Sequence, residues 1–240
     1  MAEEKQEEKP RGSCLGKLIS LITFGGVLGL GAAVFFIAQP QDLSDIKGVG
    51  SASSLNGGKA RDLREVLKNS VSRGYPLTLT EEEINLYLKQ TLAAKQGGGL
   101  DKVVKIEGVR VRLEDERAEI VIERSVMGRP MTVSMYVRVI QELDVQGRTK
   151  TSILRDGGAF FPELPRLEKL VKGGRFGKLV VPQGFLLLVL KPYQELAKIY
   201  ESELQQAFEE MSRISIAKGK LVLDPQAGGG SALPQPGEEF

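Results

Sequence analysis

Residues 18–38 read LISLITFGGVLGLGAAVFFIA, and this stretch decides how the rest of the chain is arranged. It holds 21 residues without a charged side chain. A helix of about 20 apolar residues can cross the roughly 30 Å hydrocarbon core of a bilayer, with its backbone polar groups satisfied internally. The stretch is longer than the apolar region of a cleaved signal peptide. We therefore predict a transmembrane helix over 18–38 that is retained as an anchor.

Basic residues flank this stretch unequally. Four precede it and one follows within the next 20 residues: Lys5, Lys9, Arg11 and Lys17 before it, and Lys47 after it. Positively charged flanks of a membrane helix stay in the cytoplasm. We therefore predict a cytoplasmic N-terminal tail over 1–17, a single pass through the inner membrane, and a large domain in the periplasm or outside the cell.

Small residues recur every four positions inside the predicted span, at Gly25, Gly29 and Ala33. Such a face lets two membrane helices approach closely and offers a surface for helix packing. Glycine is also common in membrane helices that do not pair. We favour this second interpretation and keep helix pairing at the three residues as the alternative.

The composition excludes several classes of function. The chain has 240 residues, no histidine, one cysteine (Cys14) and a formal net charge of +2. Without histidine there is no Ser-His-Asp or Cys-His nucleophile, and zinc sites lose one of their main ligands. A near-neutral chain also lacks the electrostatic footprint of a nucleic-acid-binding protein. We predict no enzyme activity, no cofactor, no metal and no nucleic-acid partner.

The chain after the predicted span divides into three parts. Residues 39–59 are rich in Gly and Ser without a periodic apolar pattern, which is typical of a flexible linker. The globular domain is predicted over 60–224. The Gly- and Pro-rich end, 225–240, is predicted to be a disordered tail.

The clearest local signal in the domain is the start of a helix. Thr80 at the N-cap with Glu83 three residues later forms a capping box, and Leu79 with Ile84 forms a hydrophobic staple. This pattern predicts a helix from residue 81 to about residue 95. A shorter helix is predicted before it, over 60–72, from the spacing of its apolar residues.

From residue 102 the apolar period changes to two, which predicts antiparallel strands joined by hairpins and makes the domain α+β. The polar positions of these strands carry a set of arginines: Arg110, Arg112, Arg117, Arg124, Arg129 and Arg138. Glutamates are interspersed among them, so we interpret this face as solvated. The alternative is a basic surface for anionic lipid headgroups or a cell-wall polymer.

The last third of the domain contains a long apolar stripe at helical spacing. Its members are Tyr193, Ala197, Tyr200, Leu204, Ala207 and Met211. This spacing predicts one long amphipathic helix over 192–213, packed against the sheet. A final hairpin or bulged strand is predicted over 214–223. The apolar run 179–190 before the helix is interpreted as core, with exposed apolar surface as the alternative.

Two short motifs carry a resemblance to a known family. The sequence LTEEEINLYL over 79–88 resembles the "LT-x-x-E-[IL]-N" helix of YpmS-like proteins, which are bacterial, anchored by a single N-terminal span and of unknown function. The ending ISIAKGKLVL over 214–223 is similar to the closing strands of these proteins and of tubular lipid-binding-type domains. The resemblance implies a curved antiparallel sheet packed against a long helix, with a groove that holds lipid in some members.

These observations lead to two functional hypotheses for a membrane-anchored envelope protein. In the first, the domain binds a lipid or another apolar ligand in a sheet–helix groove, because methionines and aromatics adapt to irregular apolar ligands. The groove residues would be Met131, Val133, Met135, Phe185, Tyr193, Tyr200, Leu204 and Met211. These residues could equally pack together as an ordinary core. In the second, the protein is a structural or assembly subunit with an envelope protein partner and no small-molecule ligand.

Overall fold

The computed structural model describes residues 14–48, 61–96, 106–126, 128–143, 145, 149–156 and 173–226. The helices are α1 (Cys14–Ile37), α2 (Leu63–Arg73), α3 (Glu81–Gln96), the 3₁₀ helix η1 (Gln183–Val189), α5 (Leu190–Ile199) and α6 (Glu201–Glu210). The strands are β1 (Leu77–Thr80), β2 (Ile106–Leu113), β3 (Ala118–Val126), β4 (Arg129–Leu143), β5 (Thr149–Arg155), β6 (Gly174–Phe176), β7 (Leu179–Val181), β8 (Arg213–Ala217) and β9 (Lys220–Asp224).

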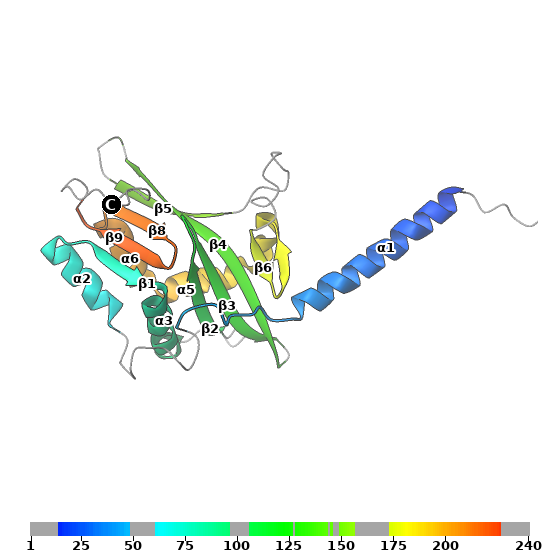
Figure 1. The fold of residues 1–240 in the computed structure, drawn as a ribbon, viewed down its shortest axis with the longest axis horizontal. Helices are drawn as coiled ribbons and strands as arrows, with labels where there is room; N and C mark the ends of the chain where they lie inside the picture. Colours follow the sequence, from blue (N-terminus) through cyan, green and yellow to red (C-terminus); the bar gives the residue numbers. More distant parts are fainter. Residues whose placement is uncertain are drawn as a thin grey trace, which may run out of the picture.

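The strands form two antiparallel sheets (Figure 1). The larger sheet has the order β2-β3-β4-β6-β7. The first half of the long strand β4 pairs with β6 and its second half pairs with β5. The smaller sheet has the order β1-β9-β8. The α+β class and the antiparallel strands agree with the prediction, whereas β1, β6 and β7 were not predicted as strands.

The register of the larger sheet separates two faces. One face, here the apolar face, carries Val109, Ile122, Val133 and Met135, which are at most 7 % exposed. It belongs to one continuous core that also contains residues of α3, η1, α5 and the smaller sheet. The Tyr193 hydroxyl of α5 lies 3.0 Å from the carbonyl oxygen of Val133 and attaches this helix to the sheet.

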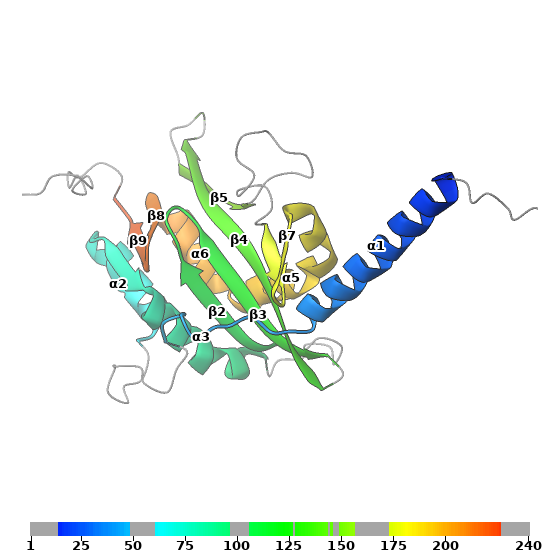
Figure 2. The same cartoon turned by 45° about the vertical axis from the view of Figure 1, so that its right-hand side comes forward.

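Helix α1 leaves the domain as a single rod (Figures 1 and 2). Its segment Gly16–Ile37, of 22 residues, is long and apolar enough to cross a membrane. No other helix in the described part of the chain meets this condition. Its most apolar window is not buried against the domain. This matches the stretch predicted to span the membrane.

The prediction of one long helix over 192–213 is wrong in one respect, because the structure has two helices there. α5 ends at Ile199 and α6 begins at Glu201, with Tyr200 between them at φ −110° and ψ 23°. The Tyr200 ring packs 6.3 Å from the Tyr87 ring of α3, and its hydroxyl lies 3.0 Å from the Thr91 hydroxyl. Burial of this side chain against α3 sets the direction of the chain at the break.

Candidate functional site

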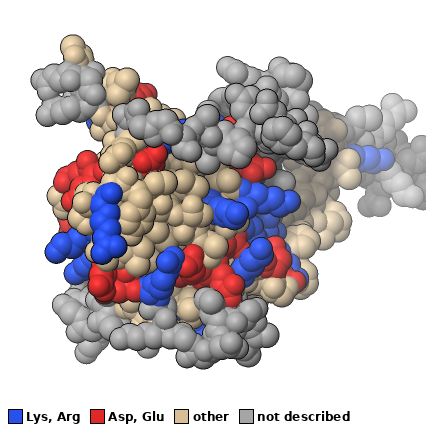
Figure 3. Space-filling model, turned by 60° about the vertical axis from the view of Figure 1, so that its left-hand side comes forward, with Lys and Arg blue, Asp and Glu red and all other residues tan. Residues whose placement is uncertain are grey.

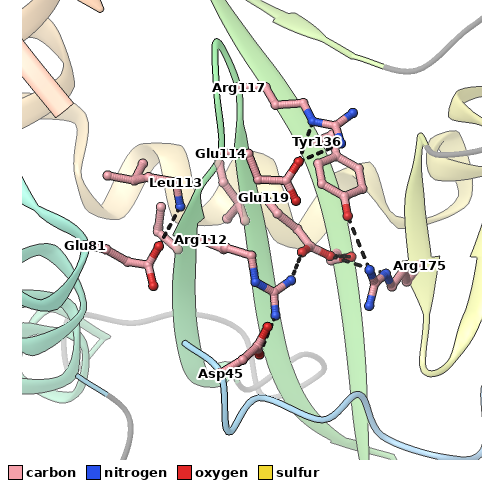
Figure 4. A network of polar contacts seen from close by, with 12 residues as sticks. Asp45, Glu81, Arg112, Leu113, Glu114, Arg117, Glu119, Tyr136 and Arg175 are labelled. Carbon is pink, nitrogen blue, oxygen red and sulfur yellow. Dashed lines mark hydrogen bonds and ion pairs between the residues drawn. The ribbon is translucent and has the colours of Figure 1, made fainter. Parts of the chain in front are cut away.

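The polar face of the larger sheet carries a buried network of charges (Figure 4). Glu119 on β3 is fully buried, and the register places Arg112 of β2 directly opposite it. One Glu119 carboxylate oxygen accepts from Arg112, and the other accepts from the Ser134 hydroxyl of β4 at 2.6 Å. The Arg175 guanidinium of β6 lies 3.7 Å from the same carboxylate. Four strands therefore meet at one carboxylate.

Tyrosine and arginine side chains extend this network along β4. The Tyr136 hydroxyl lies 3.5 Å from the Arg175 guanidinium, and Arg117 lies 4.4 Å above the Tyr136 ring. Arg117 also pairs with Glu114 at 2.6 Å and with Asp156 at 3.3 Å. Burial raises the pKa of the Tyr136 phenol, and the nearby Glu119 carboxylate raises it further. Each arginine has more than one electron-rich neighbour.

The interpretation of this face as solvated is wrong for its central residues. The side chain of Arg112 is 15 % exposed and that of Arg110 is 12 % exposed, and Arg110 pairs with Glu123 at 3.3 Å. Burial by itself lowers the pKa of Arg112, but Glu119 and Asp45 together raise it above its ordinary value. These arginines are structural counter-ions within the fold.

A segment following α1 crosses this face, and we call residues 39–48 the strap. The backbone N–H of Gln41 donates to the Thr132 hydroxyl at 2.8 Å, and the Asp45 carboxylate accepts from Arg112 at 2.7 Å. Ile46 is 2 % exposed. The strap runs from the β6–β7 side of the sheet, over β4 and β2, to α3 (Figures 1 and 2). The predicted flexible linker is therefore wrong for residues 39–48, while 49–59 lie outside the described residues.

Helix α3 holds the far end of the strap and the free edge of β2 together. Asn85 is fully buried; its amide oxygen accepts from the Val111 N–H at 2.7 Å, and its amide nitrogen donates to the carbonyls of Val111 and Lys47. Glu81 accepts from the N–H groups of Lys47 and Leu113. The predicted capping box brings these two side chains into place.

The capping box itself is confirmed. The Thr80 hydroxyl accepts from the Glu83 N–H at 3.2 Å, and the Glu83 carboxylate accepts from the Thr80 N–H at 2.9 Å. Because this pair fixes where α3 begins, it also fixes the positions of Glu81 and Asn85 one turn apart. Asn85 is the last residue of the motif that resembles YpmS-like proteins, and in this structure it hydrogen-bonds both the edge of β2 and the strap.

The start of the strap is fixed by the turn between β6 and β7, and we call this contact the junction. The Lys178 N–H donates to the Phe36 carbonyl at 3.0 Å, so the turn satisfies a terminal carbonyl of α1. Gly177 adopts φ +56°, and a Cβ there would lie 2.3 Å from the Gln39 carbonyl oxygen and 2.5 Å from that of Ile37. Glycine permits both the left-handed turn and the close backbone approach.

An open cleft of about 700 Å³ lies where the strap, β2 and the β8–β9 turn meet. Its lining has as many acidic as basic side chains: Asp45, Glu81, Glu114, Asp115 and Glu116 against Lys47, Arg112, Arg117, Arg138 and Lys218. Basic and acidic side chains are similarly interspersed on the domain face seen in Figure 3. Among the described residues, the lining of the cleft is thus made mainly of charged side chains, with Leu113 as its one large apolar residue, whereas a site for a lipid chain is lined mainly by apolar side chains.

The predicted groove residues are distributed between core and surface. Five of them lie in the closed core: Val133, Met135, Tyr193, Tyr200 and Met211. Leu204 is half-buried against this core, and Met131 is half-buried on β4. Phe185 is 47 % exposed on η1. The structure therefore brings most of this set together as packed core, which was the alternative to a ligand groove.

The predicted helix-packing residues lie on α1. A Cβ added at Gly25 or Gly29 would meet nothing within 4 Å, and Ala33 is half-buried at the same helix. Pairing at this face stays a prediction. In the described ranges, no three His, Cys, Asp or Glu side chains are grouped as a metal site requires.

The sequence analysis did not find the strap or the junction. The Gly- and Ser-rich composition of 39–59 favoured a flexible linker over an ordered segment. The apolar residue Ile46 and the Asp42–Ser44 turn were the available signals of local order. Comparisons with protein families, with curated proteins and with solved structures find no match to this chain. The resemblance to YpmS-like proteins stays a prediction that rests on its two motifs.

Proposed function

We propose that this chain is a single-pass membrane protein without enzymatic activity, which holds its α+β domain in a fixed orientation against the bilayer as a structural subunit of an envelope assembly. α1 is the anchor, with its N-terminus in the cytoplasm and the domain on the far side of the inner membrane. The length and exposure of α1 support the anchor, and the basic residues before it support the orientation.

The observation that carries this proposal is the junction together with the strap. A flexible tether of about 20 residues would let the domain sample orientations within roughly 25 Å of its anchor. Instead, the Phe36 carbonyl is bonded to the β6–β7 turn, and the strap is bonded to the sheet through Gln41 and to α3 through Lys47. A domain attached in this way transmits its position to the membrane helix, as a scaffold must.

The buried carboxylates of Glu81 and Glu119 support a structural role over a catalytic one. Both oxygens of Glu81 accept backbone N–H groups, and both oxygens of Glu119 are engaged by Arg112, Ser134 and Arg175. A general acid or base needs an oxygen that can reach a substrate proton. The lipid-carrier hypothesis receives less support, because most of its groove residues are packed in the core.

A distance measurement in a membrane tests the fixed orientation. The full chain would carry one spin label at Cys14 and a second at Leu143→Cys, at the far end of β4, and would be reconstituted in lipid nanodiscs. We expect one narrow distance distribution. Replacement of 39–48 by Gly and Ser residues of equal number should widen it at least twofold. A native chain with a distribution as wide as the replaced one would refute the proposal.

A pair of glycine variants provides a matched control for the junction. Gly177 and Gly128 both adopt positive φ, at +56° and +75°, but a Cβ at Gly128 would meet nothing within 4 Å. Both substitutions to Ala carry the cost of the left-handed backbone. Gly177→Ala should widen the distance distribution, whereas Gly128→Ala should leave it narrow.

Labelling from one side of the membrane tests the orientation separately. In spheroplasts of a bacterial host, a membrane-impermeant maleimide should react with a cysteine at Leu143→Cys and leave Cys14 unlabelled. In inverted vesicles the pattern should reverse. The opposite pattern would place the domain in the cytoplasm and would leave the fixed orientation to be judged by the distance measurement alone.

A further inference from the structure

Apart from α1, the large apolar side chains exposed in the described part of the chain form two groups and one single residue, Tyr75. One group lies on β4, β5 and the chain between them, and includes Leu143 at 75 % exposure. The other lies on η1, where Phe185, Leu187 and Leu188 are 47 %, 56 % and 78 % exposed. Large apolar side chains gathered in this way commonly mark interaction sites.

The η1 group is presented on a fixed base. Leu186 and Val189 of the same helix are 0 % and 8 % exposed and belong to the core. Gln183 at its start donates to the Arg155 carbonyl at 3.0 Å. The seven residues of η1 read QGFLLLV and carry no charge. The chain thus buries two apolar side chains of this helix and displays three others.

The position of η1 is continuous with the attachment of α1. η1 follows β7 after a single residue, and the β6–β7 turn holds the end of α1. Figures 1 and 2 both show the β6–β7 hairpin and the following helical turns on the side of the domain from which α1 leaves. Two exposed lysines, Lys178 and Lys191, flank the apolar group in sequence. The β4–β5 group lies at the other end of the sheet.

We infer that η1 is a second membrane contact, which inserts Phe185, Leu187 and Leu188 into the headgroup and upper acyl region of the bilayer that α1 crosses. This inference rests on the proposed span of α1. An apolar surface flanked by lysines suits such an interface, because lysine side chains reach anionic headgroups while their neighbours enter the apolar layer. With α1 and the junction, the contact would give the domain two points of attachment.

Fluorescence of the full chain in liposomes tests this contact. In a Cys14→Ser background, an NBD label would be placed at Leu188→Cys, with Leu143→Cys as a control of nearly equal exposure. The liposomes would contain phosphatidylcholine and phosphatidylglycerol with or without doxyl-labelled phosphatidylcholine. We expect doxyl lipid to reduce the signal at position 188 at least twofold and to leave position 143 unchanged. Leu187→Cys provides a second label site on the same helix.

A label at Leu28→Cys, in the middle of α1, separates the two proposals. Quenching at position 28 without quenching at 187 or 188 would overturn the η1 contact and leave the span intact. No quenching at position 28 would overturn both. A blue-shifted label at 188 that doxyl lipid does not quench would also overturn the inference, since it would indicate a protein partner or a second copy on this surface.

Discussion

The centres of the two faces of the larger sheet are equally buried but are held together by different forces. On the apolar face, Ile122 and Val133 pack against helices of the core. On the polar face, Glu119 and Ser134 are just as inaccessible, but they are covered by charged neighbours and lie beside the strap. The apolar face needs only close packing, whereas the polar face needs every charge to keep its partner. The second face is therefore the more sensitive to single substitutions.

The largest expected effect is removal of the central carboxylate. Glu119→Ala removes the buried carboxylate that pairs with the largely buried Arg112 and the half-buried Arg175, and breaking a buried ion pair typically costs about 3–5 kcal/mol. On the apolar face, Ile122→Val should cost about 1 kcal/mol. Urea unfolding of the full chain in detergent measures both. The exposed pair Lys198–Glu195 supplies a control, since Lys198→Ala should change the free energy by less than about 0.5 kcal/mol.

The next largest loss of stability is expected at the edge of the sheet, where β2 meets α3. Asn85→Ala removes the partners of the Val111 N–H, the Val111 carbonyl and the Lys47 carbonyl. Leaving such groups unpaired should cost about 2–4 kcal/mol in the same unfolding measurement. Lys89→Ala, at an exposed position of the same helix, should have little effect. Equal values for the two variants would contradict the proposed role of Asn85.

A difference in alkaline stability should distinguish one tyrosine on each side of the sheet. Burial raises the pKa of Tyr193, at the apolar face, well above its ordinary value, and it raises the pKa of Tyr136, at the polar face, by a smaller amount. Above pH about 10 the unfolded chain loses phenol protons that the folded chain retains, so the free energy of unfolding falls as pH rises.

Replacing each tyrosine by phenylalanine measures its share of this loss. Tyr193→Phe should remove about 1 kcal/mol of the stability lost between pH 10 and 11, and Tyr136→Phe should remove less. Below the pKa of the unfolded phenol, neither variant should change the pH dependence. An equal alkaline slope in both variants and in the parent chain would show that the two phenols are not shielded.

The smallest effect has the opposite sign and concerns the strap. The Gln41 side chain is 7 % exposed, and among the described residues neither its amide oxygen nor its amide nitrogen has a hydrogen-bond partner. Gln41→Met keeps the length of the side chain, leaves the backbone bond to Thr132 in place and removes the buried amide. We expect a gain of about 1 kcal/mol. A loss of stability would mean that the amide is satisfied in solution.

The sequence predicts local features of this fold well because their causes are local. The alternation of apolar residues places Val109, Ile122 and Val133 on one face, and the Thr80–Glu83 pair begins α3. The alternation does not predict what covers the polar face, since arginine side chains occur both on solvated faces and in buried charge networks. A clue was available in the hairpin register, which sets Arg112 against Glu119.

The features that the sequence analysis missed depend on contacts between distant residues. The apolar stripe from Tyr193 to Met211 is continuous in the sequence, but the helix is interrupted at Tyr200. The Tyr200 ring packs against that of Tyr87, which lies 113 positions earlier in the chain. The strap is held by Thr132, Arg112 and Glu81, none of them near it in sequence. Amino-acid composition indicates how a segment behaves without tertiary contacts, and for this reason it predicted a flexible linker over 39–59.

The strap also changes where the domain begins. Residues 39–48 are the first part of the domain to be synthesised, but their partners on β2, β4 and α3 all come later in the chain. This segment is joined directly to the end of α1, so its partners must form around a piece of chain that is already attached there. A fragment that starts at residue 60 would lack the strap, whose Gln41 and Ile46 are buried in the domain. The unit that folds therefore includes the strap as well as the domain that follows it.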